Sequence, residues 1–231
     1  MPGGFMVFVV LLIIAVIVGA VFSHRAAKKR QAALLLWATE NDLSYDMGKD
    51  RSLENRFPLH KCLREGSDRY AENLMEGERD GRGICAFDYH YETYSTNSKG
   101  QRQTHHHNFS AVVVDTGLPL KSLSIRSENF FDKLTEFVGY DDIDFELTEF
   151  SNKFYVKAPD RKWAYEVLHQ KTMEFLLESP RFTLEMAGPW LMARRTGRFK
   201  PEQFSDALGV TEGILDRLPR YLLKQLKGED A

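Results

Sequence analysis

The sequence predicts an α+β protein with one N-terminal transmembrane helix, followed by a soluble domain that has a largely antiparallel sheet and three to four helices. Three observations predict it: an uninterrupted apolar run near the N-terminus, a block of alternating segments in the middle, and helical patterns mixed with strands towards the C-terminus. Strands grouped in one block favour this class over a strict alternation of strands and helices. The 231 residues leave room for one anchor and one domain.

The anchor is predicted at residues 5–22, where no side chain is charged and fourteen residues are Val, Leu, Ile or Phe. Eighteen helical residues span roughly 27 Å, close to the hydrocarbon thickness of a bilayer. A cleaved signal peptide is the alternative, and Val18-Gly19-Ala20 resembles a cleavage site. The length of the run, and basic residues that follow it instead of preceding it, favour an uncleaved anchor.

The basic residues after the anchor predict its orientation and a contact with lipid headgroups. By the positive-inside rule, a helix followed by such a cluster leaves its C-terminal side in the cytoplasm. We therefore expect a single-pass protein of the cell membrane, with residues 1–4 as an outer tail, 23–41 as a basic helical stalk and 42–231 as a cytoplasmic α+β domain. The predicted membrane-surface residues are Arg25, Lys28, Lys29 and Arg30.

Strand patterns fill the middle of the chain. Residues rich in β-formers and alternating in polarity predict strands at 70–76, 84–93, 104–115 and 120–126. Asp80-Gly81 is a typical hairpin turn between the first two.

The C-terminal half mixes helices and strands. A helix is predicted at 128–138, a strand at 153–157, and a second helix that Asp160 caps and that ends before Pro180.

After these elements, residues 182–187 and 190–195 predict a hairpin around Gly188-Pro189. Pro201 begins the last helical region, which we expect Gly209 and Pro219 to break.

Histidines and carboxylates on two of these strands predict a metal site. If 84–93 and 104–115 pair in phase, one face collects Asp88, His90, Glu92 and His106, and the other face becomes aromatic core. Imidazole and carboxylate suit zinc or another divalent ion, so Asp88, His90 and His106 are candidate ligands. A register slip of one residue would separate them, and a solvated strand face is the alternative interpretation.

Other function classes lack support in the sequence. The net charge of −2 and the pI near 6.4 predict no nucleic-acid partner. Cys62 and Cys85 form no CxxC pair, which fits a reducing compartment. The chain carries no phosphate-binding loop, GxSxG or HExxH motif, so we expect no cofactor apart from the divalent metal.

Short motifs are spread along the chain at 37–38 (WA), 43–45 (LSY), 73–77 (NLMEG), 87–91 (FDYHY) and 142–155 (DIDFE to Tyr155). With the N-terminal helix, they resemble a family of uncharacterised bacterial single-pass membrane proteins of unknown function. The resemblance implies the architecture and no catalytic residues.

These observations favour a membrane-tethered cytoplasmic interaction or scaffold domain that is not an enzyme, with the lipid bilayer and a membrane or cytoplasmic protein as partners. Two alternatives stay open. One is a metal-dependent hydrolase that uses the region of His90 and His106. The other is a domain that senses anionic lipid at the inner leaflet through residues 25–30.

Overall fold

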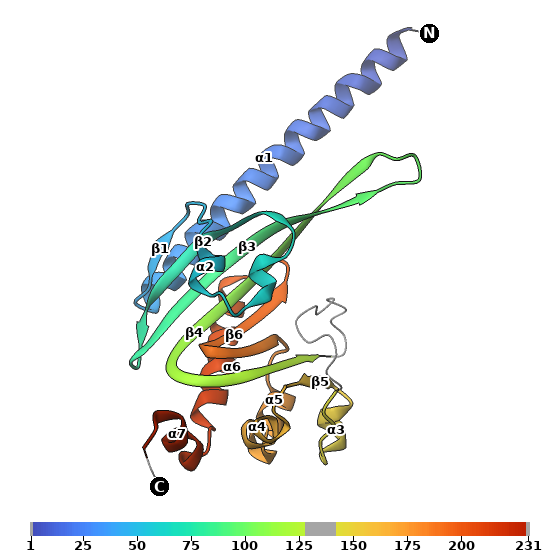
Figure 1. Ribbon diagram of the computed structural model, residues 1–231. Helices are drawn as coiled ribbons and strands as arrows, with labels where there is room; N and C mark the ends of the chain where they lie inside the picture. The colour runs from blue at the N-terminus through green and yellow to red at the C-terminus, as the bar shows by residue number, and fades with distance from the viewer. Residues whose placement is uncertain (1, 128–141, 230–231) are drawn as a thin grey trace.

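One long helix, α1 (Pro2–Glu40), projects from a sheet-based domain (Figure 1). The computed structural model describes residues 2–127 and 142–229. From Phe8 onward α1 is long and apolar enough to cross a membrane, and none of its most apolar window of 18 residues is buried. The predicted anchor and stalk are one uninterrupted helix. It is the one candidate span in the described part of the chain, which indicates a single-pass membrane protein.

In the described part of the chain, the sheet contains six strands, and all of their pairings are antiparallel. The strands are β1 (Ser44–Asp46), β2 (Ser67–Arg79), β3 (Arg82–Thr96), β4 (Arg102–Ser127), β5 (Phe154–Lys157) and β6 (Thr183–Thr196). They follow the order β1-β2-β3-β4-β5, with β6 also paired to β4. The predicted Asp80-Gly81 turn joins β2 to β3, with φ values of 52° and 72° that suit a tight hairpin. The α+β class is confirmed.

Two predictions about strand ends are wrong. Segments 104–115 and 120–126 belong to one bent strand, β4, and the predicted hairpin at Gly188-Pro189 is the bend of β6. The two bends lie opposite each other, because Leu120 pairs with Gly188 and the register shifts on both sides of Leu120. Proline has no N–H to donate, so a strand tolerates it where the ladder is already irregular.

The described helices are short apart from α1 and the helix at Pro201–Asp216. They are α2 (Leu53–Arg56), the 3-10 turn η1 (Lys61–Arg64), α3 (Thr148–Ser151), α4 (Arg161–Val167), α5 (Gln170–Glu178), α6 (Pro201–Asp216) and α7 (Arg220–Lys227). Among residues 42–127 and 142–229, four helices have at least seven residues, which agrees with the expected three to four. The predicted helix 128–138 lies outside the described residues.

Helix boundaries follow the predicted signals in part. Oδ1 of Asp160 accepts the Trp163 N–H at 3.1 Å, which caps α4 as predicted. The single helix expected after Asp160 is two helices, α4 and α5. Gly209 does not break α6, because a helix whose apolar face is buried tolerates one glycine, whereas Pro219 does separate α6 from α7.

Each face of the sheet carries an apolar core. On one face, α1 and the C-terminal helices cover residues such as Ile84 and Ala86 of β3. On the other face, the segment that contains α2 and η1 covers Phe87 and Tyr89 of the same strand. The β3–β4 hairpin has the in-phase register that the metal hypothesis required, with Asp88 opposite Ser110. The even-numbered residues of β3 therefore face α1.

Candidate functional site

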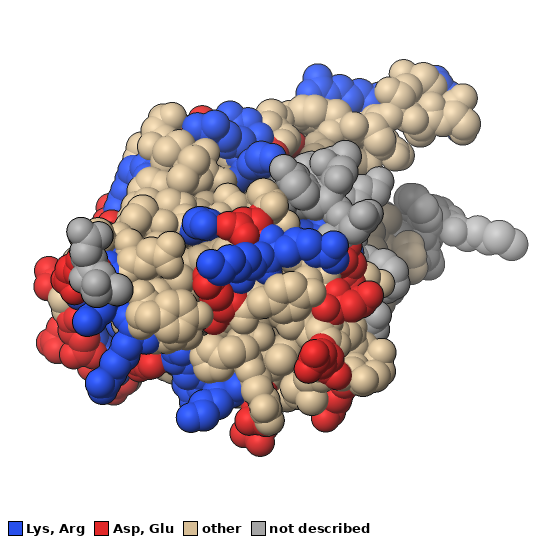
Figure 2. Space-filling model, turned by 60° about the horizontal axis from the view of Figure 1, so that its bottom comes forward, with Lys and Arg blue, Asp and Glu red and all other residues tan. Residues whose placement is uncertain are grey.

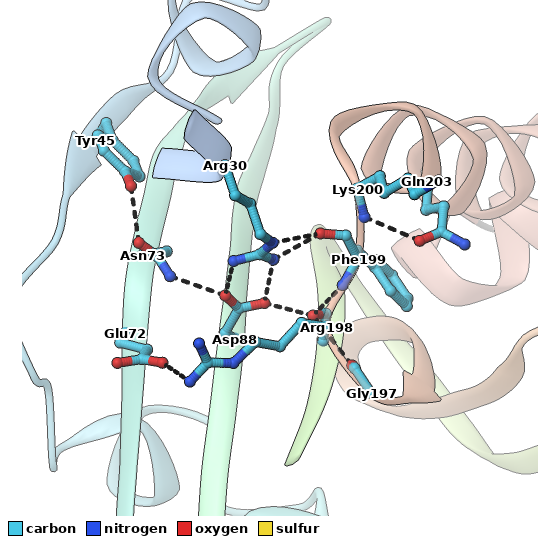
Figure 3. A network of polar contacts seen from close by, with 11 residues as sticks. Arg30, Tyr45, Glu72, Asn73, Asp88, Gly197, Arg198, Phe199, Lys200 and Gln203 are labelled. Carbon is cyan, nitrogen blue, oxygen red and sulfur yellow. Dashed lines mark hydrogen bonds and ion pairs between the residues drawn. The ribbon is translucent and has the colours of Figure 1, made fainter. Parts of the chain in front are cut away.

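A buried ion pair fixes α1 to the sheet. The guanidinium of Arg30 donates from Nη1 to Oδ2 of Asp88 at 2.6 Å and from Nη2 to Oδ1 at 2.9 Å. It also donates to the carbonyl oxygen of Phe199, at 2.9 Å from Nε and 2.6 Å from Nη2 (Figure 3). The Asp88 side chain is 2% exposed and that of Arg30 is 21% exposed. Bidentate pairing of this kind fixes orientation as well as distance.

Further donors surround Asp88. Asn73 Nδ2 donates to Oδ2 at 2.8 Å, and the Ser110 hydroxyl donates to Oδ1. Ser110 Oγ in turn accepts the Phe199 N–H at 2.9 Å, and Asn73 Oδ1 accepts from the Tyr45 hydroxyl at 2.7 Å. Burial raises the pKa of Tyr45, which therefore stays a neutral donor. We call Arg30, Asp88, Asn73, Ser110 and the Phe199 backbone the anchor lock.

Apolar contacts on the same face of α1 extend the lock towards the end of the helix. Leu34 and Trp37 follow Arg30 at positions i+4 and i+7, which places all three on one helical face. Both are buried in the main core. Trp37 packs its ring 5.4 Å from that of Phe204 and donates from Nε1 to Ser205 Oγ at 2.7 Å. The last turns of α1 are therefore part of the domain core.

The lock changes the assignment of two predicted site residues. Arg30, predicted to lie at the membrane surface with the other bases, is partly buried instead, and its guanidinium is held by the buried Asp88 carboxylate and the Phe199 carbonyl. Asp88 was a candidate metal ligand, but both of its oxygens are occupied by protein donors. The other three bases, Arg25, Lys28 and Lys29, are exposed on α1.

A cluster of His90, Glu92 and His106 lies further along the same face of the sheet. One potential ligand atom of each residue lies within 4.8 Å of the other two. Oε1 of Glu92 is 3.2 Å from His106 Nδ1 and 3.9 Å from His90 Nε2. The predicted hydrolase depends on this region, and the structure brings Glu92 into the cluster in place of Asp88.

The sequence contains two separate signals for the lock, which become informative only when they are combined. Asp88 stands in a strand whose neighbours are aromatic, so it needed a buried cation. Arg30 was the one basic residue of its cluster at helical spacing from both Leu34 and Trp37. Joining these two signals required knowing that α1 crosses this face of β3.

The end of the domain that bears α4 and α7, away from the N-terminal part of α1, has an open hollow and a surface of mixed charge (Figure 1). The open hollow of about 620 Å³ lies between α4 and α7, and its lining includes Tyr165, His169 and Tyr221. Basic and acidic side chains alternate over this face, with no large area of one sign (Figure 2). Such mixing is typical of a solvated surface.

The sequence matches no protein-family model and no curated protein. Among solved structures, the crystal structure of the mycobacterial trehalose monomycolate transport factor A, TtfA, is similar, with a TM-score of 0.58 and 12% sequence identity. The match covers 82% of this chain and 96% of that one. The two proteins share a fold. At this identity the likeness concerns the fold alone, and it carries no site residues from one protein to the other.

Proposed function

We propose that this protein is a non-enzymatic accessory scaffold that holds its α+β domain at a fixed position against the inner face of a membrane, where it binds a membrane-associated protein. The observation that carries the proposal is the anchor lock, in which Arg30 of the membrane helix pairs with the buried Asp88 of the sheet. A domain on a flexible tether would need no such pair.

The lock lies close to the membrane. Arg30 is eight residues beyond Phe22, the end of the predicted span, so the pair lies about 12 Å from that end at a rise of 1.5 Å per residue. A headgroup layer is roughly 5–8 Å thick on each side of the bilayer, so the pair lies only a few ångströms beyond it. The domain therefore starts at the membrane surface, with little freedom to rotate about α1.

An apolar surface on the outer side of α1 supports a protein partner. Leu35 and Leu36 are 51% and 59% exposed, although they lie beyond the predicted span and beside the lock. The neighbouring Leu34 and Trp37 are buried in the domain, so the helix is apolar on two sides at this level. Exposed apolar residues gathered next to a membrane favour packing against another protein.

The three exposed bases supply the orientation. Arg25, Lys28 and Lys29 follow the apolar stretch, and none of residues 1–4 is basic, so the positive-inside rule favours a cytoplasmic domain. A fusion of a fluorescent protein that folds only in the cytoplasm to the C-terminus tests this, because a dark fusion would contradict the orientation.

The fold comparison agrees with an accessory role. The similar structure is titled a transport factor. A transport factor with the same fold therefore supports an accessory role as the proposal for the present chain.

Site-specific photocrosslinking in native membranes tests the proposal. A photoreactive residue at Leu36 should capture one reproducible protein, whereas the same residue at Tyr221, 57% exposed on α7, should not. Asp88→Asn should reduce capture at position 36, since it loosens the lock. Lipid adducts alone at position 36 would contradict the scaffold and favour the anionic-lipid role that Arg25, Lys28 and Lys29 can support.

A further inference from the structure

We propose that His90, Glu92 and His106 form a binding site for a divalent transition-metal ion of the zinc class. The ligand atoms are His90 Nε2, Glu92 Oε1 and His106 Nδ1. The site goes beyond the scaffold role and does not depend on it.

The strand register builds the cluster. Glu92 pairs directly with His106 across β3 and β4, and His90 lies two residues before Glu92 on the same face. In a tetrahedral zinc site with bonds of about 2.1 Å, ligand atoms lie about 3.4 Å apart. The distances of 3.2 Å and 3.9 Å from Glu92 Oε1 to the two imidazoles are close to this value. One ligand nitrogen of His90 and one of His106 lie within 4.8 Å of each other, so the two imidazoles must rotate towards a common point to close the site.

Hydrogen bonds already orient two of the three ligands. His90 Nδ1 lies 3.1 Å from the amide oxygen of Asn108, which keeps the proton on Nδ1 and leaves the lone pair of Nε2 for a metal. The Tyr94 hydroxyl donates to Oε2 of Glu92 at 3.1 Å, which leaves Oε1 for the metal. Supporting contacts of this kind accompany metal ligands in proteins and set their affinity.

Packing holds the His90 ring in place. It lies between the rings of Tyr70 and His106, at centroid distances of 4.8 Å and 5.5 Å. The His90 side chain is 11% exposed, whereas that of His106 is 61% exposed. The site is therefore anchored on one side and open to solvent on the other, as expected for an ion that keeps a water ligand.

The ligand chemistry selects the class of metal. Two imidazoles and one carboxylate suit zinc and its neighbours, whereas magnesium requires an octahedron of oxygen atoms. With both histidines neutral, the single charge of Glu92 partly neutralises the cation.

The adjacent histidines provide a matched control. His105 and His107 belong to the same run but point to the other face, where they contact Ser95 Oγ at 2.7 Å and Thr93 Oγ1 at 2.8 Å. A His-rich run that chelated metal without a built site would use them as readily as His106.

Isothermal titration of the tag-free full chain in detergent with zinc chloride tests the site. We expect one zinc per chain, no heat with magnesium chloride, and unchanged binding for His105→Ala. His106→Ala and Glu92→Gln should each weaken binding at least tenfold, and Asn108→Ala about tenfold. Circular dichroism verifies that each variant is folded.

Two results would overturn the site. One is the absence of zinc binding by the folded wild-type chain. The other is an equal loss of affinity in His105→Ala and His106→Ala, because this would assign the binding to the run as a whole.

Discussion

Replacing Asp88 by Asn tests whether the anchor lock stabilises the domain. The change keeps the shape of the side chain but removes the charge that faces Arg30, and it turns an amide N–H₂ towards groups that themselves donate. Breaking a buried ion pair by removing one partner costs about 3–5 kcal/mol. Arg30 is 21% exposed and keeps its bonds to the Phe199 carbonyl, so we expect about 3 kcal/mol, at the low end of this range.

Glu72→Gln provides the matched control. Glu72 pairs with Arg198 close to the lock (Figure 3), but the two side chains are 20% and 47% exposed. An ion pair in contact with water contributes about 0–1 kcal/mol, so this variant should unfold almost as the wild type does. Urea unfolding of the full chain in detergent, followed by tryptophan fluorescence, measures both variants.

Hydrogen exchange locates the effect. In Asp88→Asn, the amides of residues 30–40 should lose protection first, because the last turns of α1 are held by the lock and the core beside it. A double-mutant cycle with Arg30→Gln should give a coupling energy of about 2 kcal/mol or more. A destabilisation by Asp88→Asn no larger than that by Glu72→Gln would refute the reasoning.

Three further predictions concern α6, the thiols and pH. Gly209→Ala, with open space around it, should stabilise the protein by about 0.5–1 kcal/mol in urea unfolding, whereas Gly213→Ala should destabilise it, since the new methyl group would meet the Phe175 ring. Burial raises the pKa of the Cys85 thiol, so alkylation read by mass spectrometry should be slow until urea unfolds the chain. A hydrogen bond from Lys121 lowers the pKa of Asp160 below its unfolded value of about 3.9. The resulting stabilisation of the fold is present above a pH of about 3.9 and is lost as the pH falls through the folded pKa. Urea midpoints between pH 7 and pH 3 should therefore fall less for Asp160→Asn than for the wild type.

Local signals in the sequence predicted most elements that depend on neighbouring residues. The apolar run, the Asp80-Gly81 turn and the Asp160 cap each act within a few residues, and each is confirmed. The bend at Gly188-Pro189 is the counterexample. A glycine and a proline there are equally compatible with a hairpin and with a strand that follows a bent partner, and only the pairing with β4 decides between them.

Candidate site residues were harder to assign, because their contacts also depend on how distant segments of the chain pair. The alternation of polar and apolar residues along β3 and β4, together with the in-phase register of the two strands, correctly placed Asp88, His90 and His106 on one face of the sheet. The alternation could not show that Arg30, 58 positions away, would bind the Asp88 carboxylate, because that contact depends on where α1 crosses the sheet. Glu92 stood on the predicted face but was not among the candidate ligands, and its direct pairing with His106 becomes visible only in the ladder.

The anchor lock also limits how α1 can stand in a membrane. The β3–β4 hairpin extends from the sheet in the same general direction as the N-terminal part of α1 (Figure 1). Its turn is exposed and carries Lys99, with Arg102 at the start of β4. Charged side chains cost about 2.5–3.5 kcal/mol each at the bilayer centre, so the turn must remain among headgroups or in water. Because the lock joins α1 to the sheet that bears this hairpin, the tilt of α1 in a membrane also determines how close the hairpin comes to the bilayer. In the proposed arrangement, the ion pair, the charged turn and the three exposed bases on α1 would together hold this side of the domain towards the membrane, and the hollow between α4 and α7 would face away from it.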